Sequence, residues 1–153
     1  MHLMCLGRYG IFRDEFYYLA CARHLDWGYV DHPPLSIAFL AVWTGLFGDS
    51  VVALRVPALV AGALIVFLTG VLVRELGGGR FAQATACLAV LIAPLFLAMS
   101  NFYSMNVFDQ LCWVALAWVL VRFLNTGAGR YWIIFGLVAG VGLQNKISVA
   151  FFG

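Results

Sequence analysis

The chain has little charge, and this shortage decides its class. Asp, Glu, Lys and Arg make up only 10% of its 153 residues, whereas 64% are hydrophobic and the mean hydropathy is +0.97. Soluble domains carry about 25% charged residues. A soluble protein could not cover so apolar a chain with polar groups. The composition therefore predicts an all-α, polytopic bundle of transmembrane helices.

The chain also lacks a basic run and any clustered cysteine motif. Its formal net charge is +2, from nine basic and seven acidic side chains that are dispersed along the sequence. We therefore expect no nucleic-acid partner. The four cysteines form no C-x-x-C pair and no spacing typical of a metal site. No convincing signal peptide is present, because the first twelve residues have no long apolar core.

Long apolar runs are what the sequence has in quantity. They divide it into residues 1–50, an outer-face loop with interfacial helices and an acidic motif, and residues 51–153, about four transmembrane helices of which the last is incomplete. The runs that predict spans are 51–73, 81–99, 107–124 and, as a beginning, 131–144. Pro94 is expected to kink the second of them.

Two shorter helices are expected before the first span. Residues 13–27 mix polar and apolar side chains and end at Gly28, which suits a helix cap. Residues 35–47 follow a double proline and are apolar, but 13 residues are too few to cross a bilayer. We expect this second helix to lie in the membrane interface or against the bundle.

The arginines in the turns predict the orientation. Short loops on the cytoplasmic side are enriched in Lys and Arg. The turns after the first and third spans carry Arg74, Arg80, Arg122 and Arg130, whereas loop 100–106 carries none. Residues 1–50, loop 100–109 and Lys146 are therefore expected together on the outer side.

Acidic residues are concentrated at the beginning of the chain. Four of the seven lie within the first 31 positions, and Asp14 and Glu15 are adjacent. One interpretation is helix capping, since carboxylates favour helix N-termini. The other is a general base or a metal ligand, which the nearby Tyr17 and Tyr18 favour because their rings suit contact with a sugar or a lipid headgroup.

Three further polar residues have two interpretations each. Asp109 either caps a span at the interface or serves a site, and a charge inside a span costs about 2.5–3.5 kcal/mol. Lys146, like Arg55, either extends to lipid headgroups or binds a phosphate. His32 is interpreted as a locally hydrogen-bonded turn residue or a metal ligand.

The sequence resembles a known family of membrane enzymes. The pattern Tyr9-Gly10-x-Phe12-Arg13-Asp14-Glu15-x-Tyr17-Tyr18, continued by Asp31-His32-Pro33-Pro34-Leu35, is similar to the first outer loop of the glycosyltransferase family 39, or protein mannosyltransferase-like, proteins with the GT-C fold. The aminoarabinose transferase of lipid A is a relative in this family. Further matches are Ala53-Leu54-Arg55-x-Pro57 and Asn145-Lys146.

The resemblance implies inverting transfer of a sugar from a polyprenyl-phosphate donor to a lipid, glycan or protein acceptor. It implies a bacterial inner-membrane protein whose active site faces the periplasm or exterior. Asp14 would deprotonate the acceptor, and Glu15 would orient it or help hold a divalent cation. Arg55 and Lys146 would bind the donor phosphate. Substrate contacts would come from Tyr17, Tyr18, His32 and Asp109, the last also a candidate metal ligand.

Members of this family are several hundred residues long and have a span before the first outer loop. We therefore expect the 153 residues to carry the motif without a complete donor site and to be inactive alone. Two other interpretations stay open: a fragment of a transporter or channel, in which Asp109 and Lys146 would line the pathway, and a membrane remnant without catalytic activity.

Overall fold

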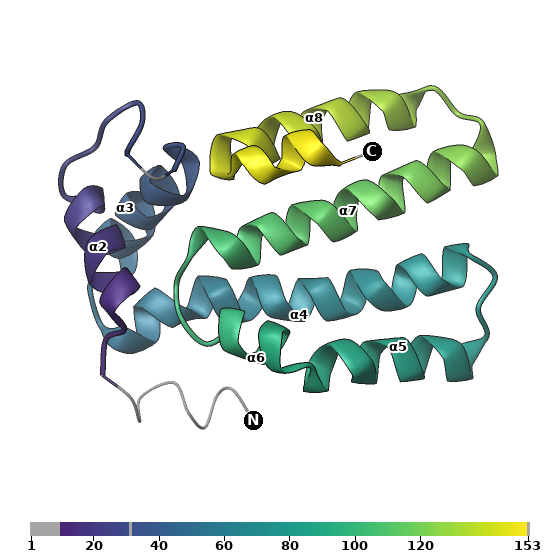
Figure 1. Ribbon diagram of the computed structural model, residues 1–153, viewed down its shortest axis with the longest axis horizontal. Coiled ribbons are helices and arrows are strands. Elements are labelled where there is room, and N and C mark those ends of the chain that lie inside the picture. Colours follow the sequence, from purple (N-terminus) through teal and green to yellow (C-terminus); the bar gives the residue numbers. More distant parts are fainter. Residues whose placement is uncertain (1–9, 31, 153) are drawn as a thin grey trace.

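The computed structural model describes residues 10–30 and 32–152, so Tyr9 and Asp31 of the acidic motif lie outside the described residues. Within these ranges the chain is helical and forms no strand, which confirms the predicted all-α class (Figure 1). The elements are α2 (Arg13–Ala22), α3 (Leu35–Phe47), α4 (Val51–Glu75), α5 (Arg80–Ile92), α6 (Pro94–Met99), α7 (Met105–Thr126), α8 (Arg130–Asn145) and the 3-10 helix η1 (Ile147–Phe151).

The two longest helices, α4 and α7, lie side by side in the middle of the bundle (Figure 1). α5 packs along α4, and α8 packs along α7. α4 has 25 residues and α7 has 22, and both are long and apolar enough to cross a membrane. The turns α4–α5 and α7–α8 lie at one end, whereas α2, α3 and the loop before α7 lie at the other.

The second predicted span, residues 81–99, is not continuous, and in this respect the prediction is wrong. α5 ends at Ile92 and α6 begins at Pro94. Ala93 between them is extended, with φ −64° and ψ 125°. A residue that precedes proline is disfavoured in the helical region, and proline itself suits the first position of a new helix. Pro94 therefore divides the segment instead of kinking it.

The first predicted helix, 13–27, is also shorter than expected. α2 ends at Ala22, well before Gly28. The reason is the Tyr29 side chain, whose hydroxyl lies 3.2 Å from the Cys21 carbonyl and 3.1 Å from that of His24, and accepts a bond from the Asp26 amide (3.1 Å). The Cys21 carbonyl also accepts the His24 amide at 3.0 Å, so a tight turn, to which Tyr29 is bonded, follows α2 in place of a further helical turn. α3, by contrast, has the predicted bounds.

A proline inside α4 leaves a backbone carbonyl for another helix. Pro57 has no N–H, so it cannot bond the carbonyl of Ala53 one turn earlier. The indole Nε1 of Trp43 on α3 donates to that carbonyl at 2.8 Å. A buried carbonyl without a partner is costly. Trp43 therefore compensates for Pro57 and fastens α3 to the beginning of α4.

We expect Trp43→Phe to lower the free energy of unfolding by about 1–2 kcal/mol, because it removes the donor and leaves the Ala53 carbonyl unpaired. Thermal unfolding of purified protein in detergent measures this. The matched control is Trp27→Phe, since Trp27 is 95% exposed. Equal unfolding temperatures for the two variants would contradict the assignment.

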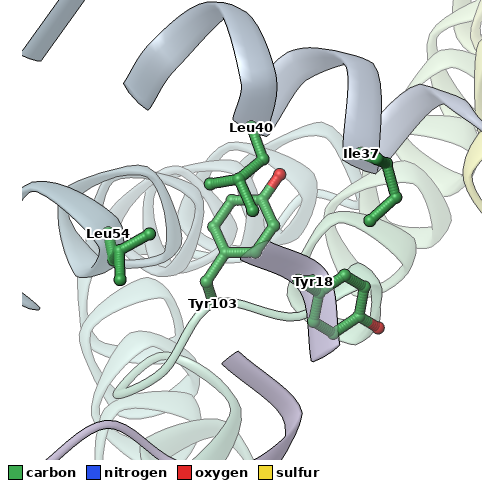
Figure 2. Packing of buried hydrophobic residues seen from close by; sticks show 5 residues of the cluster. All are labelled: Tyr18, Ile37, Leu40, Leu54 and Tyr103. Carbon is green, nitrogen blue, oxygen red and sulfur yellow. The ribbon is translucent and has the colours of Figure 1, made fainter. Parts of the chain in front are cut away.

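The core at the α2–α3 end is built around two tyrosines. Tyr18 of α2 and Tyr103 of the loop before α7 are buried with Ile37, Leu40 and Leu54 (Figure 2). The ring centroids of Tyr18 and Tyr103 are 5.8 Å apart in an edge-on arrangement. Residues from α2, α3, α4 and the loop before α7 therefore form one buried hydrophobic cluster at the end that carries the acidic motif.

Candidate functional site

Hydrogen bonds connect the polar segments at the end of the bundle that carries α2, α3 and the loop before α7. The amide of Met105 donates to the Tyr18 hydroxyl at 3.3 Å, which joins α2 to the beginning of α7. The side-chain amide of Asn145 donates to the Met105 carbonyl at 2.9 Å, which joins the end of α8 to the same point. The predicted convergence of the acidic motif, the loop before α7 and the end of α8 is confirmed.

Glu15 and Arg55 form a buried ion pair. The Glu15 side chain is fully buried and the Arg55 side chain is 5% exposed. Arg55 Nε lies 3.2 Å from Glu15 Oε1, and Arg55 Nη2 lies 3.2 Å from Oε2. Two amides complete the carboxylate shell, Tyr103 N at 3.2 Å from Oε1 and Phe12 N at 2.8 Å from Oε2. Arg55 also bonds the Gly10 carbonyl at 2.8 Å.

The ion pair gives Glu15 and Arg55 a shared structural role that the sequence analysis did not predict. Glu15 caps α2 through the Phe12 amide, as the capping interpretation expected. A charged pair is tolerated in a buried position only when its hydrogen bonds are well satisfied, as they are here. The predicted roles of Glu15 at the acceptor or a cation and of Arg55 at the donor phosphate stay predictions. Each would require this pair to open.

Asp14, the neighbour of Glu15, lies in a different environment. Its side chain is 44% exposed and lies 3.4 Å from Arg13 Nε, whose own side chain is 92% exposed. Tyr17, one turn later on α2, is 40% exposed. Exposed ion pairs contribute little stability. Asp14 is therefore an accessible carboxylate at the polar end, fixed only by its helix.

His32 lies in an aromatic cluster. Its ring stacks on Tyr18 at 5.2 Å and lies 5.7 Å from Tyr17 and 5.3 Å from Tyr29, measured between centroids. The residue is 5% exposed. Nδ1 is 3.2 Å from the Pro33 carbonyl, as expected for a turn residue, and Nε2 has no hydrogen-bond partner among the described residues. With Nδ1 donating, Nε2 is an acceptor.

Tyr103 is a site residue that the sequence did not reveal, because an aromatic residue in a short polar loop carries no distinctive signal. It is fully buried, and its hydroxyl donates to the Ser36 carbonyl at 2.6 Å. Burial, aided by the nearby Tyr18, raises the pKa of Tyr103 well above its usual value of 10. The Tyr103 hydroxyl therefore stays neutral and donates a hydrogen bond. The backbone amide of Tyr103 donates to the Glu15 carboxylate.

Lys146 belongs to a second polar cluster at the same end. It follows the last residue of α8, and its Nζ donates to Asn106 Oδ1 at 2.8 Å and lies 3.7 Å from Asp109 Oδ2. Ser148 of η1 donates to the other carboxylate oxygen of Asp109. The Lys146 side chain is 34% exposed and that of Asp109 12%. Ser148 was missed in the sequence because it lies in an apolar run.

Glu15 and Asp109, the candidate metal ligands, have separate partners. Glu15 binds Arg55, whereas Asp109 binds Ser148 and Lys146. In the part of the chain that the structure describes, no group of three or more His, Cys, Asp or Glu side chains is placed to hold a metal ion. Metal binding by these two residues stays a prediction.

An apolar cleft of about 280 Å³ lies between α3, α7 and α8. Its walls carry two polar side chains, Ser36 and Asn145, and the Ser36 hydroxyl is buried without a hydrogen-bond partner among the described residues. The other lining residues are apolar or weakly polar: Leu35, Phe39, Phe108, Leu111, Cys112 and Val141.

Comparison with known proteins gives two matches. Residues 31–153 match the family model described as dolichyl-phosphate-mannose-protein mannosyltransferase. A polyprenol-phosphate-mannose–protein mannosyltransferase of Corynebacterium glutamicum is 28% identical over 96 residues, which are 63% of this chain and 18% of that relative. The chain thus spans less than a fifth of the length of this curated relative. No solved structure matches the chain.

Proposed function

Because the chain belongs to the dolichyl-phosphate-mannose-protein mannosyltransferase family, we propose that it is part of a membrane glycosyltransferase that moves a sugar from a polyprenyl-phosphate donor to a hydroxyl acceptor. The observation that carries the proposal is the different environment of two neighbouring carboxylates. Glu15 is neutralised by Arg55, whereas Asp14 is accessible at the end of the bundle that also presents Lys146.

The proposed reaction is a single displacement with inversion. The acceptor hydroxyl attacks the anomeric carbon on the face opposite the phosphate, and Asp14 accepts the hydroxyl proton as the new C–O bond forms. The bond to the phosphate oxygen breaks and leaves its electron pair on the lipid phosphate. Lys146 stabilises the charge that develops there.

The other residues position the reactants. Tyr17, which is 40% exposed, is proposed to contact the sugar or the acceptor. The buried Nε2 of His32 would become a hydrogen-bond acceptor for them when the tyrosines around it move apart. Asp109 holds Lys146 on one side, so that the ammonium group meets the phosphate in a fixed orientation. The Glu15–Arg55 pair keeps α2 in place. The apolar cleft beside Asn145 suits part of the prenyl chain.

The proposed acceptor is a protein, glycan or lipid hydroxyl. Mannose is the sugar named for the relative from Corynebacterium glutamicum. The chain is a membrane protein by family and by its two apolar helices. The arginine-rich turns favour an orientation in which the α2–α3 end faces away from the cytoplasm. The bacterial inner membrane is the location that the family resemblance implies.

The test uses membranes that contain the complete gene product carrying this sequence and a radiolabelled polyprenyl-phosphate mannose. We expect label in a hydroxyl acceptor and no transfer by the 153 residues alone. Lys146→Gln should lower kcat/KM about a hundredfold, because a cation at the leaving group is lost. Arg23→Gln, which removes an exposed cation paired with Asp49, is the control. Absence of transfer from every polyprenyl-phosphate sugar tried would contradict the proposal.

A further inference from the structure

The end of the bundle opposite the candidate site carries four arginines. Arg74 lies in the last turn of α4, Arg80 begins α5, Arg122 lies near the end of α7 and Arg130 begins α8. Figure 1 shows that the two turns between these helices lie at the same end of the molecule. The hairpins therefore gather charges that are up to 56 positions apart in the sequence.

Glu75 is the acidic side chain at this end of the described structure, and it is already neutralised. Arg122 Nη1 lies 3.1 Å from each Glu75 carboxylate oxygen, and the Glu75 side chain is 11% exposed. Asn125 fastens the same residue through a bond to its backbone carbonyl (2.7 Å). With Glu75 and Arg122 cancelling, three arginines leave this end with a net charge of +3.

The three remaining arginines face solvent. The Arg74 side chain is 65% exposed and lies 3.8 Å from Glu75 Oε1, a carboxylate that it shares with the closer Arg122 (3.1 Å). Arg80 and Arg130 are exposed and occupy the first positions of α5 and α8, whose first turns contain no acidic residue. A helix N-terminus carries partial positive charge and favours an anion. An arginine at this position adds a full positive charge to that partial charge, so an anion from outside the protein is bound more favourably.

Large apolar side chains lie beside these arginines. Leu76 is 67% exposed, Phe81 86% and Trp132 54%. Each is within two residues of Arg74, Arg80 or Arg130 in sequence. Aromatic and aliphatic side chains next to arginines are typical of the boundary between lipid tails and headgroups.

We propose that this arginine end binds the phosphodiester headgroups of anionic phospholipids. Guanidinium groups bind phosphate oxygens in a forked geometry, and the adjacent apolar side chains enter the acyl boundary. The candidate-site end differs, because each described cation there has a carboxylate of its own: Arg13 with Asp14, Arg23 with Asp49, Arg55 with Glu15 and Lys146 with Asp109. Anionic lipid should therefore gather at the arginine end. The inference is independent of the proposed reaction.

The experiment measures the lipid selectivity of the reconstituted protein. Electron spin resonance of spin-labelled phosphatidylglycerol and phosphatidylcholine gives the relative association of each lipid with the protein. We expect phosphatidylglycerol to associate about fivefold more strongly at each lipid position beside one of the three arginines, since one basic side chain near an anionic surface contributes about that factor. The preference should fall at 0.5 M salt, where the Debye length is only about 4 Å.

The variant Arg80→Gln/Arg130→Gln should lose most of this preference. Its matched control is Arg13→Gln/Arg23→Gln, which removes two exposed arginines from the opposite end and should keep it. Equal association of both lipids with the wild type, or equal selectivity of the two variants, would overturn the proposal. If the first variant does not fold, the salt titration of the wild type decides, and a preference that salt leaves unchanged also overturns it.

Discussion

Replacing Asp14 by Asn is expected to reduce sugar transfer by about 10²–10⁴-fold, the usual contribution of a general base. The amide has the same shape as the carboxylate but cannot accept the acceptor's proton. Asp14 is 44% exposed, and its ion-pair partner among the described residues is Arg13, itself almost fully exposed, so the fold should remain intact. Transfer from a radiolabelled polyprenyl-phosphate sugar measures the loss, and the unfolding temperature confirms that the fold is kept.

The control for Asp14→Asn is Asp49→Asn. Asp49 is also an exposed carboxylate, 52% exposed, and is paired with an exposed arginine, Arg23. Its replacement removes the same charge at the same end of the molecule and should leave transfer unchanged. If Asp14→Asn retains activity within a few-fold of wild type, Asp14 is not the base. If both variants lose activity alike, the loss reflects the charge of the surface and not one reacting group.

Replacing Glu15 by Ala is expected to destabilise the fold by about 3–5 kcal/mol, as removal of one partner from a buried ion pair usually does. Arg55 would remain buried without its counter-charge, and the amides of Tyr103 and Phe12 would lose their acceptor. For a chain of this size the loss corresponds to roughly 10 °C or more in unfolding temperature. Thermal unfolding in detergent, followed by circular dichroism, measures it.

Two further variants separate this structural role from a catalytic one. Arg55→Ala should destabilise about as much as Glu15→Ala, and the double variant should cost less than the two single losses together, because the residues share one interaction. Activity should disappear with the fold, at the temperature where the helices unfold. If Glu15→Ala has the unfolding temperature of the wild type but transfers no sugar, Glu15 acts on the substrate instead.

The local features of this fold could be predicted from the sequence. α3 has the predicted bounds because local residues set both of its ends. The double proline before Leu35 favours the start of a helix, and Gly48 after Phe47 ends it. Gly48 adopts φ +79°, a conformation that favours glycine. The end of α8 at Asn145 also agrees with the polar interruption in the apolar run. In these places neighbours in sequence decide the outcome.

The predictions of the end of α2 and of a continuous second span were wrong, because a side-chain hydrogen bond or a following proline overrides the helical pattern there. Tyr29 ends α2 early through its hydroxyl, which no helical periodicity reveals. Pro94 acts on the residue before it, so a kink became a break at Ala93. In the candidate site, topology was enough to predict that Lys146 and Asp109 meet at one end. It was not enough to show that Glu15 and Arg55 bind each other, because that depends on how α3 packs against both α2 and α4.

The groups that bind the Glu15 carboxylate are synthesised at different times. Glu15 leaves the ribosome 40 residues before Arg55 and 88 residues before Tyr103. At about 5–20 residues per second, its counter-ion follows after about 2–8 s and the Tyr103 amide after about 4–18 s. The buried carboxylate of Glu15 therefore has both its counter-ion and its second amide donor only after most of the described chain has been synthesised.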